Sequence, residues 1–494
     1  MKKAPLQACL ILGIFLFGNL IAYKLIHVPM RLELVGLFSL ILFYPILRNP
    51  LVGVYAMFII LPFIPHLRRL YYLLYSRPSL DPLIIIGDIL IVFILIGLFF
   101  EFKEHYDRYR PVRAYIVIII CYFLYMLARV FVFNSQQLSE SASKFKLYGP
   151  PVLSFLVGLA YSTRISHLKR IWVITIVTGI IAGLYGIKQL YVGYSEAEKI
   201  WFNTINFTTL FIKGVARPFS FFQAPVAFAD YQQLAIIGVL ILSSCKVKFS
   251  KAFLILIPFF FYATLITSVR SSWIGIMATF IIWITLFHVK GNKNRILLLS
   301  SFALCLALGE IIFGTLSDGL SLGGFINLVT RVIPNQKYID LLVINRTTAL
   351  ENPLSEHSLL SRFMLWKYIL ASSAEPIKAI LGRGLGTLKA DSLYMTYLAE
   401  FGYPGLLFII IMIGTFIKKG LHLMDTTRNL DVGALAKGIT IMNMVFALIS
   451  VTGTHIHYFP GDIYFWFWNG VLVMLSANQH EKETEIQHEN LNHY

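Results

Sequence analysis

Apolar runs long enough to cross a membrane recur from one end of this chain to the other. The hydrocarbon core of a bilayer is about 30 Å thick, so a helix that crosses it needs about 20 mostly apolar residues. Of the 494 residues, 57% are hydrophobic and only 14% are charged, which is more apolar surface than a soluble core can bury. The pattern therefore predicts an all-α, polytopic integral membrane protein with about 12–14 transmembrane helices.

The expected spans lie at about 6–23, 32–47, 51–65, 83–100, 114–133, 151–162, 171–192, 223–243, 252–268, 272–289, 296–313, 393–417, 434–451 and 459–476. The first run follows Lys2 and Lys3, as a signal peptide does. No small-x-small cleavage site follows its apolar stretch, so we expect this run to remain as an anchor.

Basic residues indicate which loops face the cytoplasm. Five alternate loops are rich in Lys and Arg: "EFKEHYDRYRPVR", "RISHLKR", "CKVKFSK", "KGNKNR" and "KKGLHLMDTTRN". The positive-inside rule assigns these loops and both termini to the cytoplasm, and it assigns the long loop of about 314–391 to the outer face. The net charge of +17 is explained largely by this pattern, so no nucleic-acid partner is expected. Residues 477–494 form a polar tail whose composition is typical of disorder.

The predicted outer face nevertheless carries many arginines: Arg68, Arg69, Arg77, Arg217, Arg270, Arg331, Arg346, Arg362 and Arg383. The planar guanidinium group suits bidentate contact with phosphate, so these residues indicate an anionic, phosphate-bearing ligand. Contact with lipid headgroups or water is the alternative. Arg217 and Arg270 lie at the expected membrane boundary, where a charge usually indicates function, although a snorkelling side chain would also explain them.

The long outer loop is expected to contain an interfacial helix and a glycine-rich turn. The stretch "LLSRFMLWKYILASS" (359–373) repeats apolar residues at helical spacing, and Pro376 is expected to close this helix. The following "GRGLGT" contains Gly384 and Gly386, whose amides could approach an anion, or it is simply a turn between helices. Asp391 comes next, at the outer end of an expected span.

Four stretches resemble the O-antigen ligase and polysaccharide polymerase family of bacterial membrane proteins: "ARPFSFFQAPVAFADYQQL", "TSVRSSWIGI", "SRFMLWKYIL" and "PIKAILGRGLGTLKADSLYMTYLAEFGYPGLL". The resemblance covers about residues 215–417, the expected core with its loop of about 314–391. Residues 1–214 and 418–476 are expected to be flanking transmembrane helices. Length and composition resemble the teichuronic acid branch of this family.

The resemblance implies a metal-independent glycosyltransferase of the bacterial cytoplasmic membrane that needs no cofactor. Its donor would be a glycan on undecaprenyl pyrophosphate, its acceptor a hydroxyl in O-antigen-like, capsular or teichuronic acid polysaccharide, and its partners a chain-length regulator or flippase of the same pathway. Asp391, Arg270 and Arg217 would be catalytic. The substrate would be bound by Arg362, Arg383, Gly384, Gly386 and His357.

The identity of the general base stays open at this stage. Ligases of the family carry a histidine at the position of Asp391, whereas many polymerases carry an aspartate, which favours polymerisation. Asp391 could instead cap the helix that starts at Ser392 or Leu393. His357 and Glu356 are competing bases on the same loop.

Two other functional classes compete with this interpretation. A multi-pass transporter or flippase of lipid-linked glycans would also have many helices, but no internal repeat of the kind transporters show is visible, and Asp88 and Asp230 are among few acids expected within the membrane. The second rival is a glycosyltransferase that uses a metal in an outer loop, but the acidic pair usual in its first outer loop is missing, since "KLIHVPMRLE" contains only Glu33. Separately, the stretch "GTHIHYFPGD" would offer His455, His457 and Asp462 to a metal, although no further ligand is obvious.

Overall fold

The computed structural model describes residues 31–74, 82–104, 106–131, 138–205, 210–212, 215–245, 250–286, 357–386 and 390–492. The expected spans at 6–23 and 296–313 lie outside the described residues. So does most of the predicted outer loop, including Glu356, Arg331 and Arg346, and so does Arg77 in an earlier segment.

The chain divides into two compact units. The described elements of the first unit are α2 (Arg31–Arg48), α3 (Pro50–Ile60), η1 (Leu61–Phe63), α4 (Ile64–Leu74), η2 (Pro82–Ile85), α5 (Ile86–Glu104) and α9 (Glu196–Ile205). Helix α3 starts at a proline after Asn49, whose side chain accepts a hydrogen bond from the Leu51 amide. Within this unit Arg69 is buried and pairs with Glu198 at 3.3 Å. The charge of its guanidinium is therefore balanced by a buried carboxylate of the protein itself.

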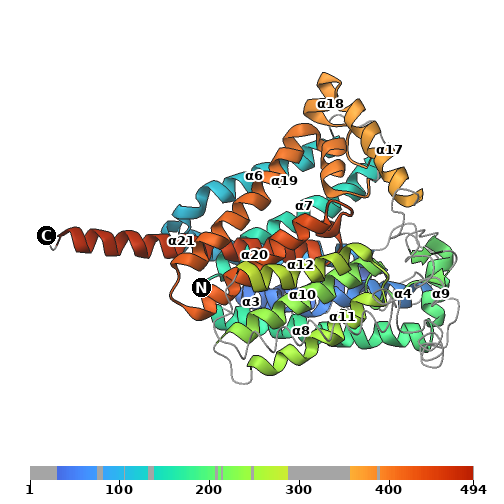
Figure 1. Ribbon diagram of the computed structural model, residues 1–494, viewed down its shortest axis with the longest axis horizontal. Coiled ribbons are helices and arrows are strands. Elements are labelled where there is room, and N and C mark those ends of the chain that lie inside the picture. The colour runs from blue at the N-terminus through green and yellow to red at the C-terminus, as the bar shows by residue number, and fades with distance from the viewer. Residues whose placement is uncertain are drawn as a thin grey trace, which may run out of the picture. The chain divides into compact units, whose positions relative to one another are not determined.

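The second unit contains the remaining described elements (Figure 1). They are η3 (Tyr106–Val112), α6 (Arg113–Phe131), α7 (Leu138–Tyr161), α8 (Ile165–Tyr191), the antiparallel hairpin β1 (Phe211–Ile212) and β2 (Val215–Ala216), α10 (Pro225–Ser244), η5 (Ser250–Leu256), α11 (Ile257–Leu265), α12 (Arg270–Leu286), α17 (His357–Ser372), α18 (Pro376–Leu381), α19 (Leu393–Thr426), α20 (Leu430–Ile449), η8 (His455–His457) and α21 (Gly461–Asn492).

The helices confirm the predicted class: this is an all-α polytopic membrane protein. Within the described residues, six helical segments are long and apolar enough to span a membrane: Pro50–Leu70, Asp107–Phe131, Ile165–Tyr191, Pro225–Ser244, Leu393–Thr426 and Leu430–Ile449. Four shorter apolar helices accompany them. Helix α10 is buried along almost its whole length, so it forms the centre of the second unit.

Three local expectations differ from the structure. Helix α7 begins at Leu138 instead of near residue 151, because Lys144 finds a buried carboxylate and the helix can therefore continue through a charged segment. Pro376 opens α18 at its first turn, where the missing N–H is tolerated, and α17 already ends at Ser372. The C-terminal tail is helical as far as Asn492, since its Glu, Lys and Gln residues favour helix extension from α21.

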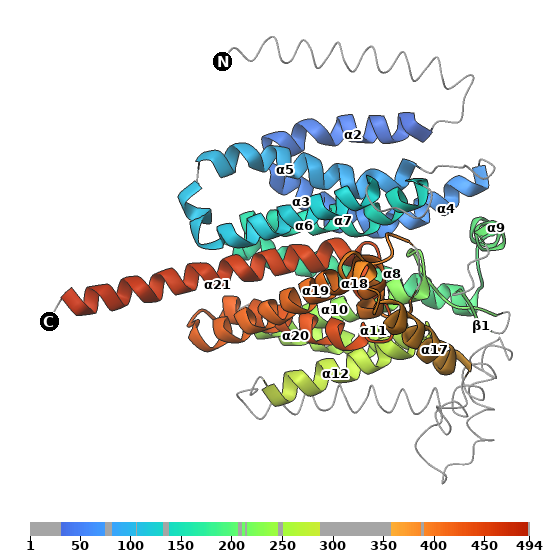
Figure 2. The same cartoon turned by 90° about the horizontal axis from the view of Figure 1, so that it is seen from above.

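Helices α7 and α21 pack side by side through glycines (Figure 2). A Cβ atom at Gly158 of α7 would collide with the Phe467 carbonyl of α21, and one at Gly470 of α21 would collide with the Phe155 carbonyl of α7. In a membrane, small residues of this kind let helix backbones approach closely and gain van der Waals contact. These glycines therefore fix the distance between the two helices.

The close contact predicts a destabilising effect for a single added methyl group. Gly158→Ala should lower the free energy of unfolding by about 1–3 kcal/mol, because backbone atoms cannot move aside as a flexible side chain can. Gly414→Ala in α19 is the matched control, since a Cβ atom there meets nothing within 4 Å. Thermal unfolding of the purified protein in detergent measures both variants, and equal stability for the two would contradict this packing.

Candidate functional site

Glu400 in α19 is fully buried and forms the centre of a charged cluster in the second unit. Its Oε1 atom accepts a hydrogen bond from the Gly386 amide at 3.0 Å and lies 3.9 Å from the ammonium of Lys144 in α7. Tyr148, one turn further along α7, also interacts with the carboxylate. A buried carboxylate needs such partners, because the loss of hydration is costly without them.

The backbone beside Glu400 leaves the helical path. Gly402 has φ 71° and Pro404 has no N–H, so the helix cannot supply the usual donors to the carbonyls one turn earlier. Other segments provide them: the Arg383 amide donates to Ala399 at 2.7 Å, and the Arg129 side chain donates to the Glu400 carbonyl at 3.1 Å. The end of α6 and the glycine-rich turn therefore both contact α19 at the kink, next to Glu400.

The glycine-rich turn is built against this kink. Gly382, Gly384 and Gly386 have φ angles of 67°, 105° and 84°, in the left-handed region that favours glycine. A Cβ atom at Gly382 would come within 2.5 Å of the Glu400 backbone. In this structure the Gly386 amide donates to the protein's own carboxylate, so Glu400 determines the position of the turn.

An aromatic layer surrounds the same cluster. The Tyr122 hydroxyl donates to the Tyr397 hydroxyl at 3.1 Å, and the ring of His457 lies 4.5 Å from Tyr148 and 5.6 Å from Tyr397 between ring centroids. Burial, together with the nearby charge of Lys144, lowers the pKa of His457 to about 3. His457 is therefore neutral at physiological pH and adds no charge to the site.

A second buried cluster joins α10, α12 and the loop before α21. The Nδ1 atom of His455 lies 2.9 and 3.0 Å from the two carboxylate oxygens of Asp230, and the Ser272 hydroxyl donates to Asp230 at 3.2 Å. Both members of the His455–Asp230 pair are almost fully buried. Arg270 is the first residue of α12, two positions before Ser272, so it lies at the same end of the second unit as this cluster.

Tyr458 connects this second cluster with two of the predicted catalytic residues. The pKa of its hydroxyl is raised to about 12, mainly by burial; the charges of Asp230 and Asp391 also raise it, whereas a hydrogen bond with Thr454 and the charge of Arg217 lower it. The charges of Arg217, Asp230 and Asp391 therefore all act electrostatically on this one hydroxyl. Arg217 is 9% exposed, so its guanidinium is largely withdrawn from solvent.

Asp391 is not the cap of α19. The cap is Ser392, whose hydroxyl accepts from the Met395 amide, while the Asp391 carboxylate is 65% exposed and pairs with Arg362 of α17 at 3.3 Å. The serine is preferred because its extended backbone, at φ −158°, directs the hydroxyl back to the first turn. Asp391 is thereby left accessible beside an arginine of α17.

The other predicted binding residues are distributed around these clusters. The side chain of Arg383 donates to the Tyr368 hydroxyl at 3.0 Å and lies 4.6 Å from the centre of that ring. His357 is the first residue of α17, and its side chain lies outside the described residues. Asp462 accepts from the Ile463 amide, so His455, His457 and Asp462 have separate partners.

Sequence reasoning missed the roles of Arg129, Lys144 and Glu400. Glu400 was part of the "EFGYPG" stretch used for the family resemblance, but no role was assigned to it. A lone acid within an apolar helix, followed by Gly402 and Pro404, was the signal that could have identified it, because intramembrane charges are usually paired. Its partners could not be identified in the same way, since they come from distant segments.

We expect Glu400→Gln to destabilise the protein. Glutamine keeps an acceptor for the Gly386 amide but leaves Lys144 without its buried counter-charge, so the free energy of unfolding should fall by about 1–3 kcal/mol. Glu375→Gln is the matched control, because Glu375 is exposed and pairs only with Lys378 of the next turn. Unfolding of both variants in detergent would measure the difference, and a Glu400→Gln protein as stable as its parent would show that the carboxylate charge is not needed.

No protein-family model and no curated protein matches this chain.

Proposed function

We propose that this protein is a glycan polymerase or ligase of the bacterial cytoplasmic membrane. It would transfer an oligosaccharide from undecaprenyl pyrophosphate to an acceptor hydroxyl during cell-surface polysaccharide synthesis. The observation that supports the proposal is the exposed Asp391 carboxylate paired with Arg362 at 3.3 Å, together with the electrostatic effect of both Arg217 and Asp391 on the Tyr458 hydroxyl and with Arg270 at the start of α12. Cationic groups for a leaving phosphate and a carboxylate for an incoming hydroxyl are the two requirements of such a transfer.

The proposed reaction is a single displacement at the anomeric carbon of the donor. The acceptor oxygen forms a bond to that carbon while the bond between carbon and pyrophosphate oxygen breaks, and the electron pair leaves with the pyrophosphate lipid. Arg217 and Arg270 stabilise the negative charge that develops on this group. Asp391 accepts the proton of the acceptor hydroxyl, and Arg362, 3.3 Å away, orients the carboxylate.

The second cluster offers a competing base. Asp230 orients the ring of His455 through Nδ1, as a carboxylate orients the imidazole in a catalytic triad, and this arrangement lets the other ring nitrogen accept a proton. Asp391 is the better candidate because its carboxylate is 65% exposed, whereas His455 is 2% exposed. The more exposed carboxylate is the more accessible of the two to an acceptor sugar.

A test of the proposed function needs no bilayer. Purified full-length protein in detergent should convert a lipid-linked repeat unit into longer lipid-linked chains and free undecaprenyl pyrophosphate, and it should do so in the presence of a metal chelator. A flippase would leave the lipid-linked units unchanged in length. Failure to lengthen or transfer the glycan would overturn the proposal, and activity that a divalent cation restores after chelation would overturn the metal-independent mechanism.

A further inference from the structure

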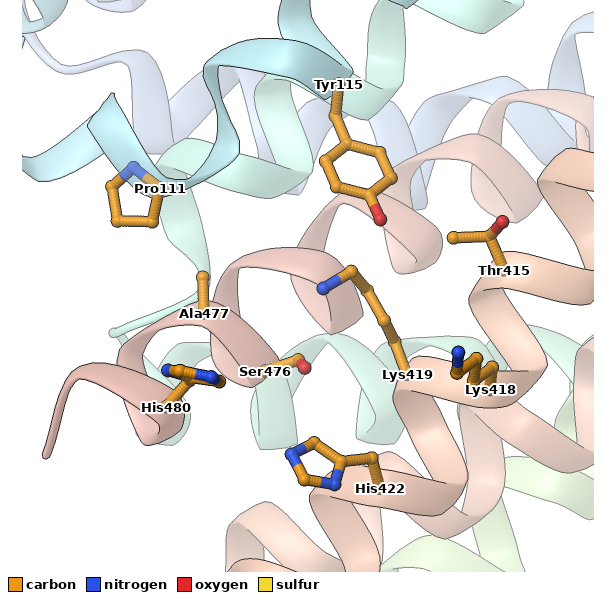
Figure 3. A pocket seen from close by; sticks show the side chains of 9 residues that line it. All are labelled: Pro111, Tyr115, Thr415, Lys418, Lys419, His422, Ser476, Ala477 and His480. Atoms are coloured by element: carbon orange, nitrogen blue, oxygen red, sulfur yellow. The ribbon is translucent and has the colours of Figure 1, made fainter. Parts of the chain in front are cut away.

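A cavity of about 550 Å³ opens in the second unit, and none of its lining residues belongs to either cluster described above (Figure 3). Its walls come from the start of α6 with the preceding η3, from the second half of α19 and from α21. The lining residues are Pro111, Tyr115, Thr415, Lys418, Lys419, His422, Ser476, Ala477 and His480.

The chemistry of this lining favours an anion. Lys418, Lys419 and His422 follow one another within little more than one turn of α19, and His480 faces them from α21. None of the nine lining residues is acidic. Ammonium groups act as compact point charges for phosphate, and they are repelled from one another when no anion is present.

Hydroxyl groups complete the set of donors. Tyr115, Thr415 and Ser476 come from three different helices, and Figure 3 shows the tyrosine and serine oxygens directed toward the side chain of Lys419. The Lys419 ammonium lies 5.3 Å from the centre of the Tyr115 ring, which holds it over the cavity. A phosphate group there would meet both charges and neutral donors.

The cavity lies where three helices change from apolar to polar sequence. Helix α6 becomes apolar after Arg113, α19 is apolar until Lys418, and α21 becomes polar after Ala477. From Glu400 to Lys418 a helix rises about 27 Å at 1.5 Å per residue, which is close to the thickness of a bilayer core of about 30 Å. The cavity thus lies at the level expected for lipid headgroups, at the end of α19 opposite to Glu400.

We propose that this cavity binds the phosphate group of an anionic membrane lipid. The shared chemistry is a phosphate ester, which a lipid headgroup or a soluble phosphate compound could supply. Position favours the lipid, because the site lies at the membrane boundary and at the end of the helices that bears the basic loops. Anionic lipids of the leaflet facing these loops attract clusters of Lys for the same reason.

A lipid bound there would hold together the three helices whose other ends surround the candidate site. Helix α6 carries Arg129, α19 carries Glu400, and α21 follows the loop with His455. The bound lipid would therefore stabilise the unit against unfolding by binding only the folded state. This inference does not depend on the proposed glycosyl transfer.

The test compares lipids on purified full-length protein in detergent. Dioctanoyl phosphatidylglycerol is the anionic probe, dioctanoyl phosphatidylcholine the zwitterionic control and inorganic phosphate the soluble control. Phosphatidylglycerol should raise the melting temperature and bind with a measurable Kd. Lys418→Gln/Lys419→Gln should weaken that Kd roughly fivefold per lysine, or about 25-fold for the pair. Lys251→Gln/Arg428→Gln, which removes two charges outside the cavity, should leave it within about twofold.

Four results would overturn the proposal. Phosphatidylcholine binding as tightly as phosphatidylglycerol would show that the charge of the headgroup is not recognised. An unchanged Kd in Lys418→Gln/Lys419→Gln would place the lipid elsewhere. Equal weakening in the control pair would show a general surface effect. Inorganic phosphate that stabilises the protein as well as the lipid does would make a soluble phosphate compound the ligand.

If the double variant does not fold, His422→Gln tests the same point, with at least a twofold weakening of the Kd expected.

Discussion

Asp391→Asn should lower the rate of glycan transfer by about a hundred- to ten-thousand-fold, because asparagine cannot accept the proton of the acceptor hydroxyl. The exchange keeps the size of the side chain. It also leaves the start of α19 intact, since Ser392 and not Asp391 caps that helix. Initial rates on a lipid-linked repeat unit, at equal amounts of purified protein, measure the effect.

Glu375→Gln is the matched control for this prediction, because it removes another exposed carboxylate from the same part of the chain. We expect it to keep the parental rate. If Asp391→Asn transfers glycan as fast as the parent, the carboxylate is not the base. The base would then be sought at His455, which Asp230 already orients, or at His357 or Glu356.

Replacing Arg217 should have the second large effect. Loss of one positioned donor to a developing anion typically raises the barrier by about 3–4 kcal/mol, so Arg217→Gln should slow transfer by roughly a hundred- to a thousand-fold. Glutamine leaves less of a cavity than alanine at a site where the guanidinium is 9% exposed. Arg217→Lys should retain partial activity, because it keeps the charge and loses the planar fork.

Two comparisons separate a catalytic role of Arg217 from a structural one. The thermal stability of Arg217→Gln and Arg217→Lys shows whether the variants fold like the parent. Arg428→Gln, in the loop before α20 at the opposite end of α19, removes a similar charge far from Tyr458 and should not alter the rate. A normal rate for a folded Arg217→Gln protein would remove this residue from the mechanism.

Some features of the protein follow from its sequence because they depend on local physics. An apolar segment of spanning length must form a helix in lipid, where every backbone polar group needs an internal partner. The expected spans accordingly lie close to α2, α5, α6, α8, α10 and α20 in the structure. The helix predicted at 359–373 from apolar residues at helical spacing is found as α17 at His357–Ser372.

The partners of the buried charges were decided only by the tertiary structure. Arg129 and Glu400 are separated by 271 positions, and Lys144 and Gly386 come from two further segments. Hydrophobic periodicity is a property of neighbouring residues, so it shows where a helix lies but not which helices meet. A charge buried in an apolar unit requires a counter-charge or a donor, yet the sequence offers many candidates and does not distinguish among them. The role of Asp391 could not be decided from the sequence either, because an aspartate at this position can cap the following helix. Only the tertiary structure shows that Ser392 is the cap and that Arg362 pairs with the Asp391 carboxylate.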